Sequence, residues 1–428
     1  MRQVSGGSEI HSSKSMRSIL WPTYSVIFAS EFTMGLFAPI LTLIFFSHHS
    51  SLFDASSSLS TRSFWYGLTI MLTQVCAIFA NLGLSALSDR VGRKKGLLIN
   101  FFGLIFQSLA CLLALISGHL FLFIIAISIS YLTYASRPIA TAAIIDNTAK
   151  DKRFLYVGMI QFFTGSAYII APYLSGHLAI LSIFTTPFTT PYLIAFSFAV
   201  ISTLLITFLY KDKKRNFTKK TQYKINDIFI LLKNKKILLL VILLMLDQLA
   251  WGTYFQFMPV IGKKIFHFST IEVGTIFSVI GISLVLSAAA IIPLMQKLFS
   301  YKYIYLIGAL CFISGILISL ISSSHPSQSF AEAFFWISLF PTVAGDVIIF
   351  SMLTVLFSQN APSHFQGLIT GVIYTIAAGV TWGTAGILGG LLTGLEANAS
   401  LYLSLLAAMI MLIASLTYAR NFFNRIVR

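Results

Sequence analysis

The chain has 428 residues, of which 57% are hydrophobic and only 10% are charged. Soluble domains contain roughly 25% charged residues, so this composition excludes a soluble globular enzyme, a disordered chain and a nucleic-acid-binding protein. The apolar residues form long continuous runs, unlike the short alternating segments of an outer-membrane barrel. The chain is therefore predicted to be an all-α integral membrane protein, because helices satisfy their own backbone hydrogen bonds in lipid.

A membrane-spanning helix needs about 20 mostly apolar residues. The sequence contains twelve such runs, at residues 17–46, 64–87, 96–117, 119–145, 155–179, 191–210, 237–262, 271–295, 303–323, 332–358, 367–393 and 400–418. The first run is too long for the core of a signal peptide and follows a polar segment. It is therefore predicted to be a retained span.

Lysine and arginine are distributed unevenly between the loops. With a cytoplasmic N-terminus, 25 of the 29 basic residues fall in cytoplasmic tails and loops, and only Arg62, Lys263 and Lys264 fall on the opposite side. The positive-inside rule then predicts a multi-pass protein of the inner (plasma) membrane with both termini in the cytoplasm. The same bias explains the net charge of +16 without a nucleic-acid partner.

The densest basic stretch lies near the midpoint of the chain and separates six spans from six spans. The predicted domains are a cytoplasmic N-tail (1–16), an N-terminal six-helix bundle (17–210), a basic cytoplasmic linker (211–236), a C-terminal six-helix bundle (237–418) and a cytoplasmic C-tail (419–428). Glycines recur at a spacing of 18 in both halves, as Gly158 and Gly176 and as Gly371 and Gly389. Two pseudo-repeat bundles around a central cavity are typical of secondary transporters.

A charged motif follows the second span, with the sequence L-S-D-R-V-G-R-K-K over residues 87–95. It resembles the signature loop of the major facilitator superfamily, with Ser85 in place of the first glycine of that loop. The resemblance implies that Asp89 acts at a helix terminus near the eleventh span, where a carboxylate stabilises the positive end of the helix. It assigns conformational gating to Asp89, Arg90, Gly92, Arg93 and Lys94.

Two further stretches are similar to motifs of the drug:proton antiporter branch, the twelve-helix tetracycline and multidrug exporters. The fourth span contains S-R-P-I-A-T-A-A over residues 136–143, which is similar to the arginine motif of proton-coupled members. The fifth contains G-S-A-Y-I-I-A-P-Y-L-S-G over residues 165–176, which is similar to the antiporter motif, with Ala171 and Ser175 in place of glycines. The resemblance also assigns a gating role to four residues of this region: Asp146, Gly165, Pro172 and Gly176.

Four ionisable side chains lie well inside the predicted spans: Glu31, Arg137, Asp247 and Asp346. Charge at membrane depth costs about 2.5–3.5 kcal/mol on insertion scales, so each is a candidate functional residue. They fall on the first, fourth, seventh and tenth spans, which line the central cavity in the resembled fold. A carboxyl group in such a cavity can bind and release a proton. Glu31 or Asp346 is the first candidate for the proton carrier and Asp247 the next, with static ion pairs as the alternative.

Aromatic residues flank these charges at helical spacing. They are Tyr134, Trp251, Tyr254 and Phe350, which are predicted to contact a lipophilic or cationic substrate. Ordinary packing within the bundle is the alternative. The His48-His49 pair lacks further ligands, and the three cysteines are far apart in the sequence, so no metal, cofactor or disulfide is expected.

The leading hypothesis for function is a proton-coupled efflux antiporter. It would export a lipophilic or amphiphilic small molecule by alternating access, with protons and the lipid bilayer as its other partners, and would work as a monomer. The alternative is a proton-coupled importer of a metabolite or siderophore in the same superfamily. A membrane enzyme is not expected, because the sequence contains neither HExxH nor GxSxG.

The predicted topology can be tested by labelling single cysteines at Ser12 and Thr221 with a membrane-impermeant thiol reagent. We expect both to be protected in intact cells and labelled after permeabilisation, because both lie on the side with the excess of basic residues. A cysteine at Ser56, on the opposite side, is the matched control and should be labelled in intact cells. Labelling of Ser12→Cys or Thr221→Cys in intact cells would refute the topology.

Overall fold

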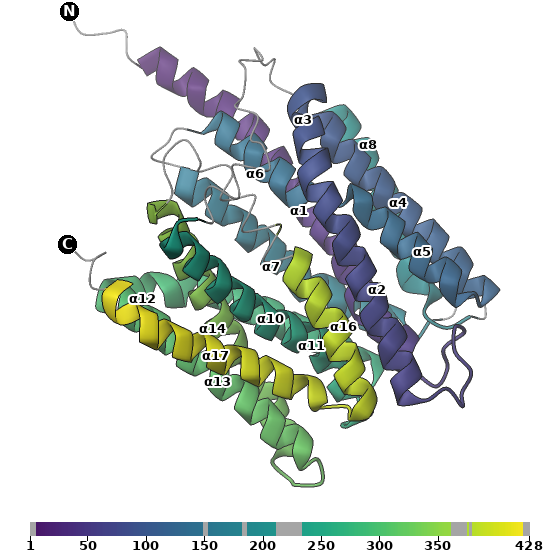
Figure 1. Ribbon diagram of the computed structural model, residues 1–428. Coiled ribbons are helices and arrows are strands. Elements are labelled where there is room, and N and C mark those ends of the chain that lie inside the picture. Colours follow the sequence, from purple (N-terminus) through teal and green to yellow (C-terminus); the bar gives the residue numbers. More distant parts are fainter. Residues whose placement is uncertain are drawn as a thin grey trace, which may run out of the picture.

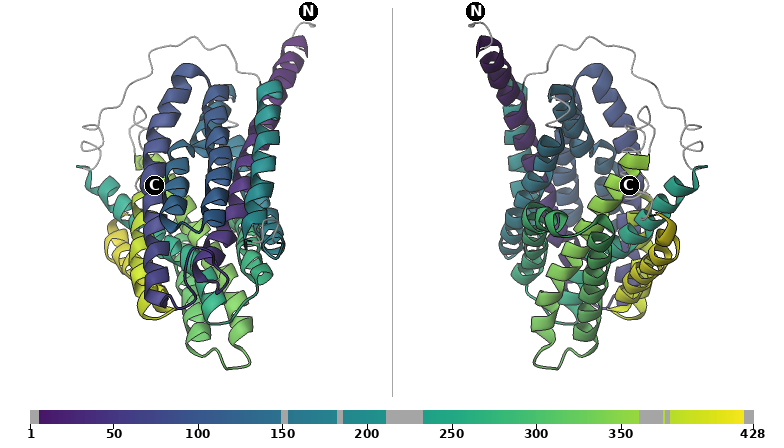
Figure 2. Two further views of the ribbon diagram at one scale, coloured as in Figure 1. Left: turned by 90° about the vertical axis from the view of Figure 1, so that its right-hand side faces the viewer. Right: turned by 90° about the vertical axis from the view of Figure 1, so that its left-hand side faces the viewer.

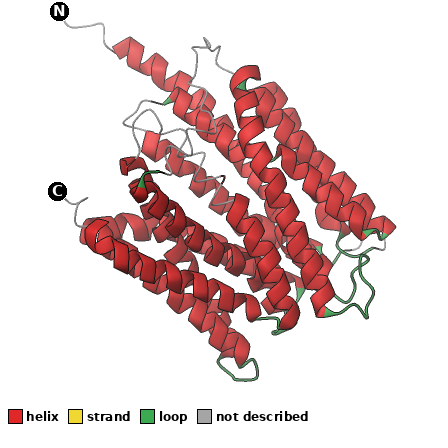
Figure 3. Ribbon diagram, in the orientation of Figure 1, coloured by secondary structure: helices red, strands yellow, loops and turns green. Residues whose placement is uncertain are grey.

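The computed structural model describes residues 6–148, 153–181, 186–210, 233–360, 375 and 379–422. Within these residues the chain consists of helices and connecting loops, without a strand (Figure 3). The longer helices are α1 (Gly6–Phe46), α2 (Leu59–Phe79), α3 (Ser85–Val91), α4 (Arg93–Ser117), α5 (Leu120–Ser130), α6 (Ser136–Asn147), α7 (Arg153–Leu178), α8 (Thr189–Leu209), α10 (Lys235–Lys264), α11 (Thr270–Leu286), α12 (Ile292–Leu298), α13 (Tyr301–Ser324), α14 (Ala331–Asn360), α16 (Trp382–Leu395) and α17 (Ala399–Phe422).

Ten stretches of the described residues are long and apolar enough to cross a membrane. The two remaining predicted spans, 155–179 and 367–393, correspond to α7 and to α16, and the start of the latter span lies outside the described residues. An all-α membrane fold is thus confirmed. Residues 211–232, which form most of the predicted linker, also lie outside the described residues. α10 begins at Lys235, where the Asn234 side chain accepts a hydrogen bond from the Lys236 N–H.

The helices form two groups that follow the sequence. Helices α1 to α8 lie together, and α10 to α17 lie together beside them (Figures 1 and 2). Two pairs of helices make the main contacts between the halves, α2 with α16 and α7 with α11. These pairs place the second span against the eleventh and the fifth against the eighth.

Corresponding spans of the two halves share an irregularity that the sequence did not predict. Between α2 and α3 lies a π-helical turn, Ala80–Leu84, and between α11 and α12 lies another, Ser287–Ile291. π-helical turns are rare and often occur at functional positions in helices. Their presence in the second and eighth spans, which are equivalent in a repeat of six, supports the pseudo-repeat.

Glycines allow the two halves to approach closely. A Cβ atom added to Gly390 of α16 would lie 2.5 Å from the Ser63 carbonyl oxygen of α2, and one added to Gly176 of α7 would lie 2.6 Å from the Thr270 carbonyl oxygen of α11. Small residues let membrane helices pack backbone against backbone, which is the main source of their attraction in lipid. We call this end of the interface, formed by the start of α2 and the end of α7, the closed end.

At the opposite end, which we call the open end, the described parts of the two halves separate. There α3 packs on α4 and α6, and α12 packs on α13, so each stays within its own half. A Cβ atom added to Gly83 would meet no atom within 4 Å. Over the described residues, the interface is therefore closed at one end and open at the other.

Two buried side chains reinforce the closed end. The Tyr66 hydroxyl of α2 donates to the Gln256 carbonyl oxygen of α10 at 2.8 Å and joins the two halves. Arg62, which the sequence places in an outer loop, is only 3% exposed and donates to the carbonyl oxygens of Phe45, Ser47 and Asp54. The guanidinium of Arg62 therefore stabilises the loop that connects α1 to α2.

The close approach at the closed end can be tested with two alanine substitutions on one span. We expect Gly67→Ala to lower the stability of the purified protein by about 1–3 kcal/mol, because the added methyl overlaps the Gly386 carbonyl oxygen. Gly83→Ala, at the open end, is the matched control and should not destabilise. Thermal unfolding in detergent measures both, and equal stability of the two variants would contradict the described interface.

Candidate functional site

The fourth span is interrupted near the middle of the membrane. After α5, a 3-10 turn (Tyr131–Thr133) leads to two non-helical residues, Tyr134 and Ala135, before α6 begins at Ser136. The freed Ala135 N–H donates to the Asn100 Oδ1 atom of α4 at 3.0 Å. A non-helical segment at membrane depth needs such a partner, because lipid offers none. Pro138 lies in the first turn of α6, where a proline is tolerated.

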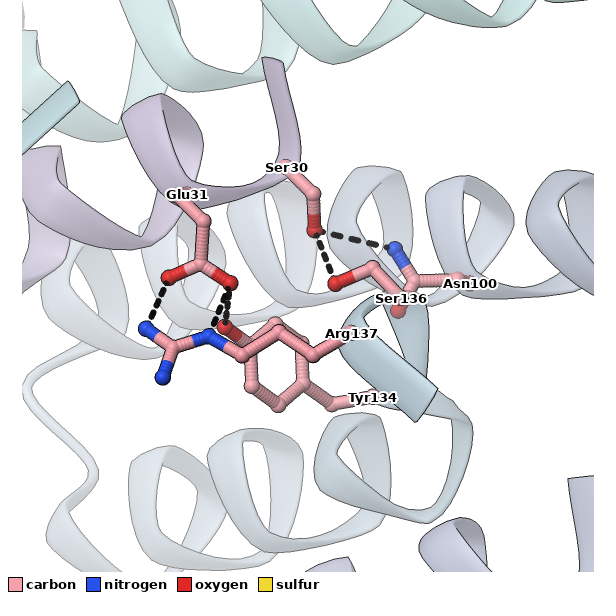
Figure 4. A network of polar contacts seen from close by, with 6 residues as sticks. All are labelled: Ser30, Glu31, Asn100, Tyr134, Ser136 and Arg137. Carbon is pink, nitrogen blue, oxygen red and sulfur yellow. Dashed lines mark hydrogen bonds and ion pairs between the residues drawn. The ribbon is translucent and has the colours of Figure 1, made fainter. Parts of the chain in front are cut away.

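This interruption positions Arg137 and Tyr134 around Glu31 of α1 (Figure 4). Arg137 donates from Nε to Glu31 Oε1 at 2.8 Å and from Nη2 to Oε2 at 2.7 Å, while the Tyr134 hydroxyl donates to Oε1 at 2.9 Å. A guanidinium and a carboxylate paired in this bidentate manner form one of the strongest ionic contacts in proteins. The predicted residues of the first and fourth spans therefore form one ion pair.

The two members of this pair differ in their exposure. Glu31 is fully buried, whereas 39% of the Arg137 side chain is exposed although it lies within a membrane span. The third guanidinium nitrogen, Nη1, points away from Glu31 (Figure 4). The chain neighbours of the two residues are also joined by hydrogen bonds. The Ser30 hydroxyl donates to Ser136 at 3.0 Å and accepts from Asn100 at 3.2 Å. Arg137 therefore keeps a partly exposed edge that Glu31 does not occupy.

The second half brings two acids together. Gln248 of α10 donates from Nε2 to Asp247 Oδ2 at 3.0 Å and to Asp346 Oδ1 of α14 at 3.2 Å. Both aspartates are buried, and the remaining Asp247 oxygen, Oδ1, has no hydrogen-bond partner. Neither aspartate forms an ion pair with a cation among the described residues. The seventh and tenth spans thus hold two neighbouring carboxyl groups.

The predicted aromatic residues occupy different surroundings. Trp251 and Tyr254 stack at 6.2 Å, as their spacing predicts, but the Tyr254 hydroxyl is bonded to Ser319 at 3.0 Å inside the second half. Tyr254 is fully buried there, which favours packing over substrate contact in this conformation. Phe350 is partly buried on α14.

The charged motif forms a tight connection between α3 and α4. Gly92 has a φ of 103°, a conformation that favours glycine. The Arg93 guanidinium donates to Ser88 Oγ at 2.7 Å and pairs with Asp89, and Lys94 Nζ donates to the Thr207 carbonyl oxygen of α8 at 2.6 Å. Arg90 is exposed. Most of the segment before α16, near which Asp89 is expected to act, lies outside the described residues.

The residues of the fifth span that are predicted to act in gating lie at the interface between the halves. A Cβ atom added to Gly165 would lie 2.5 Å from Val285 Cγ2, and the Pro172 carbonyl oxygen lies against Gly274, so both face α11, as Gly176 does. The side chain of Asp146 lies outside the described residues. No group of three potential metal ligands occurs among the residues that the structure describes.

Three residues of the site were missed by sequence reasoning. Gln248, Trp382 and Asn100 connect the charged residues to the rest of the fold. Polar amides inside membrane spans were the available signal for Gln248 and Asn100, because an amide in lipid also needs partners. Nothing in the sequence distinguishes Trp382 from the other tryptophans.

The chain belongs to the major facilitator superfamily, because the model of that family matches residues 23–386. A comparison of the sequence with curated proteins finds no significant match.

Solved structures with similar folds are transporters. They include the nucleoside transporter NupG (15% identity, TM-score 0.72, 94% of this chain and 99% of that chain) and a D-xylose-proton symporter (16%, 0.70, 94% and 97%). A POT family transporter in complex with a thioalcohol-conjugated peptide is also similar (15%, 0.72, 95% and 99%). At these identities the likeness extends to the fold alone.

The ion pair can be tested by a double-mutant cycle. We expect Glu31→Gln to destabilise the protein by about 1–3 kcal/mol, because it leaves the Arg137 charge without its partner in the membrane. Because 39% of the Arg137 side chain is exposed, the loss should be smaller than the about 3–5 kcal/mol of a fully buried pair. The double variant Glu31→Gln and Arg137→Gln should recover most of the lost stability, as measured by thermal unfolding. Tyr134→Phe, which removes one hydrogen bond to Glu31, serves as the milder control, and additive effects of the two substitutions would argue against the pair.

Proposed function

We propose that this membrane protein is a proton-coupled secondary transporter that moves a small molecule by alternating access as a monomer. The observation that supports this proposal best is the pair of buried aspartates, Asp247 and Asp346, bridged by Gln248 without a described cation. Two ionised carboxylates this close repel each other and are costly in lipid. A proton shared by the two carboxyl groups lowers both the repulsion and the cost of charge in lipid. Release of that proton then requires a change in the surroundings of the two aspartates.

Glu31 is less suited to this role in the described conformation. Its two oxygens accept three hydrogen bonds, two of them from the charged Arg137. The charge of Glu31 is therefore compensated by Arg137, whereas no described cation compensates Asp247 or Asp346. The proposed division of roles is therefore proton exchange at Asp247 and Asp346, with Glu31 fixing Arg137.

We further propose that the protein is an efflux antiporter of a lipophilic or amphiphilic molecule. The antiporter-like stretch 165–176 packs on α11 at the interface, where a change in helix contact would alter access. The open end is the end that the charge distribution predicts to be cytoplasmic. A substrate entering there would come from the cytoplasm, as export requires.

A proton-coupled importer of a metabolite or siderophore is the second candidate. The partly exposed edge of Arg137 favours it, because a guanidinium N–H at membrane depth suits a carboxylate or another oxygen acceptor of a substrate. The similar structures include a symporter for D-xylose with protons. The two candidates differ in the polarity of the substrate and in the direction of proton flow.

Proton coupling can be tested in everted vesicles that report internal pH. Ethidium serves as a lipophilic cationic probe and citrate as a polycarboxylate. We expect a transported probe to drive protons out of acidified vesicles if the protein is an antiporter, and to carry protons in if it is a symporter.

Neutral variants identify the carrier residue. Asp247→Asn or Asp346→Asn should lose uphill transport yet keep probe exchange, because an amide cannot release a proton while exchange needs no net proton movement. Arg137→Lys, which keeps the charge but loses the planar fork, tests whether the geometry of the ion pair matters. The proposal is wrong if Glu31→Gln, Asp247→Asn and Asp346→Asn all still concentrate the probe under a proton gradient.

A further inference from the structure

Gln248 connects the aspartate pair to a different helix. Its Nε2 atom donates to Asp247 and Asp346, and its Oε1 atom accepts a hydrogen bond from the Trp382 indole at 3.1 Å. An indole nitrogen can only donate, so the amide oxygen must face Trp382 and both N–H groups must face the aspartates. The orientation of this amide is therefore fixed from both sides.

Trp382 is the first residue of α16 and the place where that helix is held on α10. Its indole Cδ1 atom lies 3.2 Å from the position of a Cβ atom added to Gly252, so a larger residue there would crowd the ring against α10. Its carbonyl oxygen accepts from Gln256 Nε2 at 3.2 Å, and its ring lies 5.4 Å from Phe255. Since α16 also packs on α2 of the other half, this attachment lies directly behind the interface.

We propose that Gln248 is a positioning residue that couples the protonation state of Asp247 and Asp346 to the attachment of α16 on α10. This inference rests on the proposed proton coupling. With both carboxyl groups ionised, each needs a donor, and the two N–H groups of the amide supply one each. The oxygen then points at the Trp382 indole.

Uptake of a proton changes this balance. One carboxyl group now has an O–H that can donate to the other carboxylate, so the amide loses one of its two acceptors. The amide is then free to turn, and its bond to Trp382 weakens. Helix α16 is released from α10 on one side and can shift against α2.

Within the part of the chain that the structure describes, few other titratable groups face this site. Asp247 interacts electrostatically with the Tyr305 phenol of α13. From α17, Ser404 donates to the Ala250 carbonyl oxygen and adds no charge, and the Trp382 indole of α16 does not titrate. Loss of a Trp382 response in Asp247→Asn combined with Asp346→Asn therefore assigns that response to the two aspartates.

The experiment uses the full-length protein in detergent with Trp382 as the only tryptophan. Phenylalanine replaces Trp21, Trp65, Trp251 and Trp336, and the emission of Trp382 is followed from about pH 5 to about pH 9, a range that excludes titration of ordinary carboxyls and phenols. We expect a single pH-dependent step. The step should disappear in Asp247→Asn combined with Asp346→Asn, and also in Gln248→Leu.

Gln256→Leu is the matched control, because it removes the other glutamine bond between α10 and Trp382 without touching the aspartates. The step should remain in this variant. Gln248→Asn keeps the amide on a shorter side chain that cannot reach both sides, and should weaken the step in a protein that folds, as judged by size-exclusion chromatography.

Two results would overturn the inference: a pH-independent Trp382 signal in the parent, or a step that survives in Gln248→Leu. If either occurs while the Asp→Asn variants lose uphill transport, proton coupling stands and the role of Gln248 is wrong. A step that Gln248→Leu abolishes supports the role of Gln248 as the link from the carboxyl pair to α16. If the Asp→Asn variants then still transport uphill, it is the proposed coupling to transport that fails.

Discussion

The cost of an uncompensated charge in lipid is the constraint on which this structure depends. Helices solve the related problem of unpaired backbone polar groups by forming hydrogen bonds within the helix. In the one described non-helical segment at membrane depth, the Ala135 N–H donates to Asn100 instead. The buried acids meet the constraint in two different ways. Glu31 is matched by Arg137, whereas Asp247 and Asp346 face each other through a neutral amide. Only the second arrangement lacks a described cation, and this is the basis of the proposed proton exchange there.

The interface between the halves follows a second constraint, which is close packing without a hydrophobic driving force. Glycines on α2, α7, α11 and α16 bring backbones together at the closed end, and the open end has no comparable contacts among the described residues. Because the attraction comes from shape rather than from large buried side chains, helices can separate at one end and meet at the other at small cost. The π-helical turns in the second and eighth spans lie where such bending would occur.

The sequence predicts the helical membrane fold well, because apolar runs of this length have few other solutions. It also selects the four charged residues, since charge in a span stands out against lipid. It could not predict that the fourth span breaks at Tyr134, because that break depends on Asn100, a residue distant in the sequence. The aromatic pattern placed Trp251 and Tyr254 on one face but could not tell which face is buried, and Tyr254 turned out to bond within its own half.

Gln248 shows a different limit of sequence reasoning. It follows Asp247 directly and looks like an ordinary polar neighbour, yet its position between two carboxyl groups and an indole arises only when α10, α14 and α16 pack together. The surroundings of the aspartates therefore include a neutral residue that charge patterns do not single out. Pairwise charge patterns alone do not reveal such a three-helix arrangement.

The central claim is that the aspartate pair, and not Glu31, holds an exchangeable proton. Infrared difference spectroscopy across a pH titration tests it directly, because a protonated carboxyl group has its own C=O stretching band. We predict a protonated-carboxyl band at neutral pH that Asp247→Asn combined with Asp346→Asn removes and Glu31→Gln leaves unchanged. A band that vanishes in Glu31→Gln but persists without the two aspartates would contradict the account.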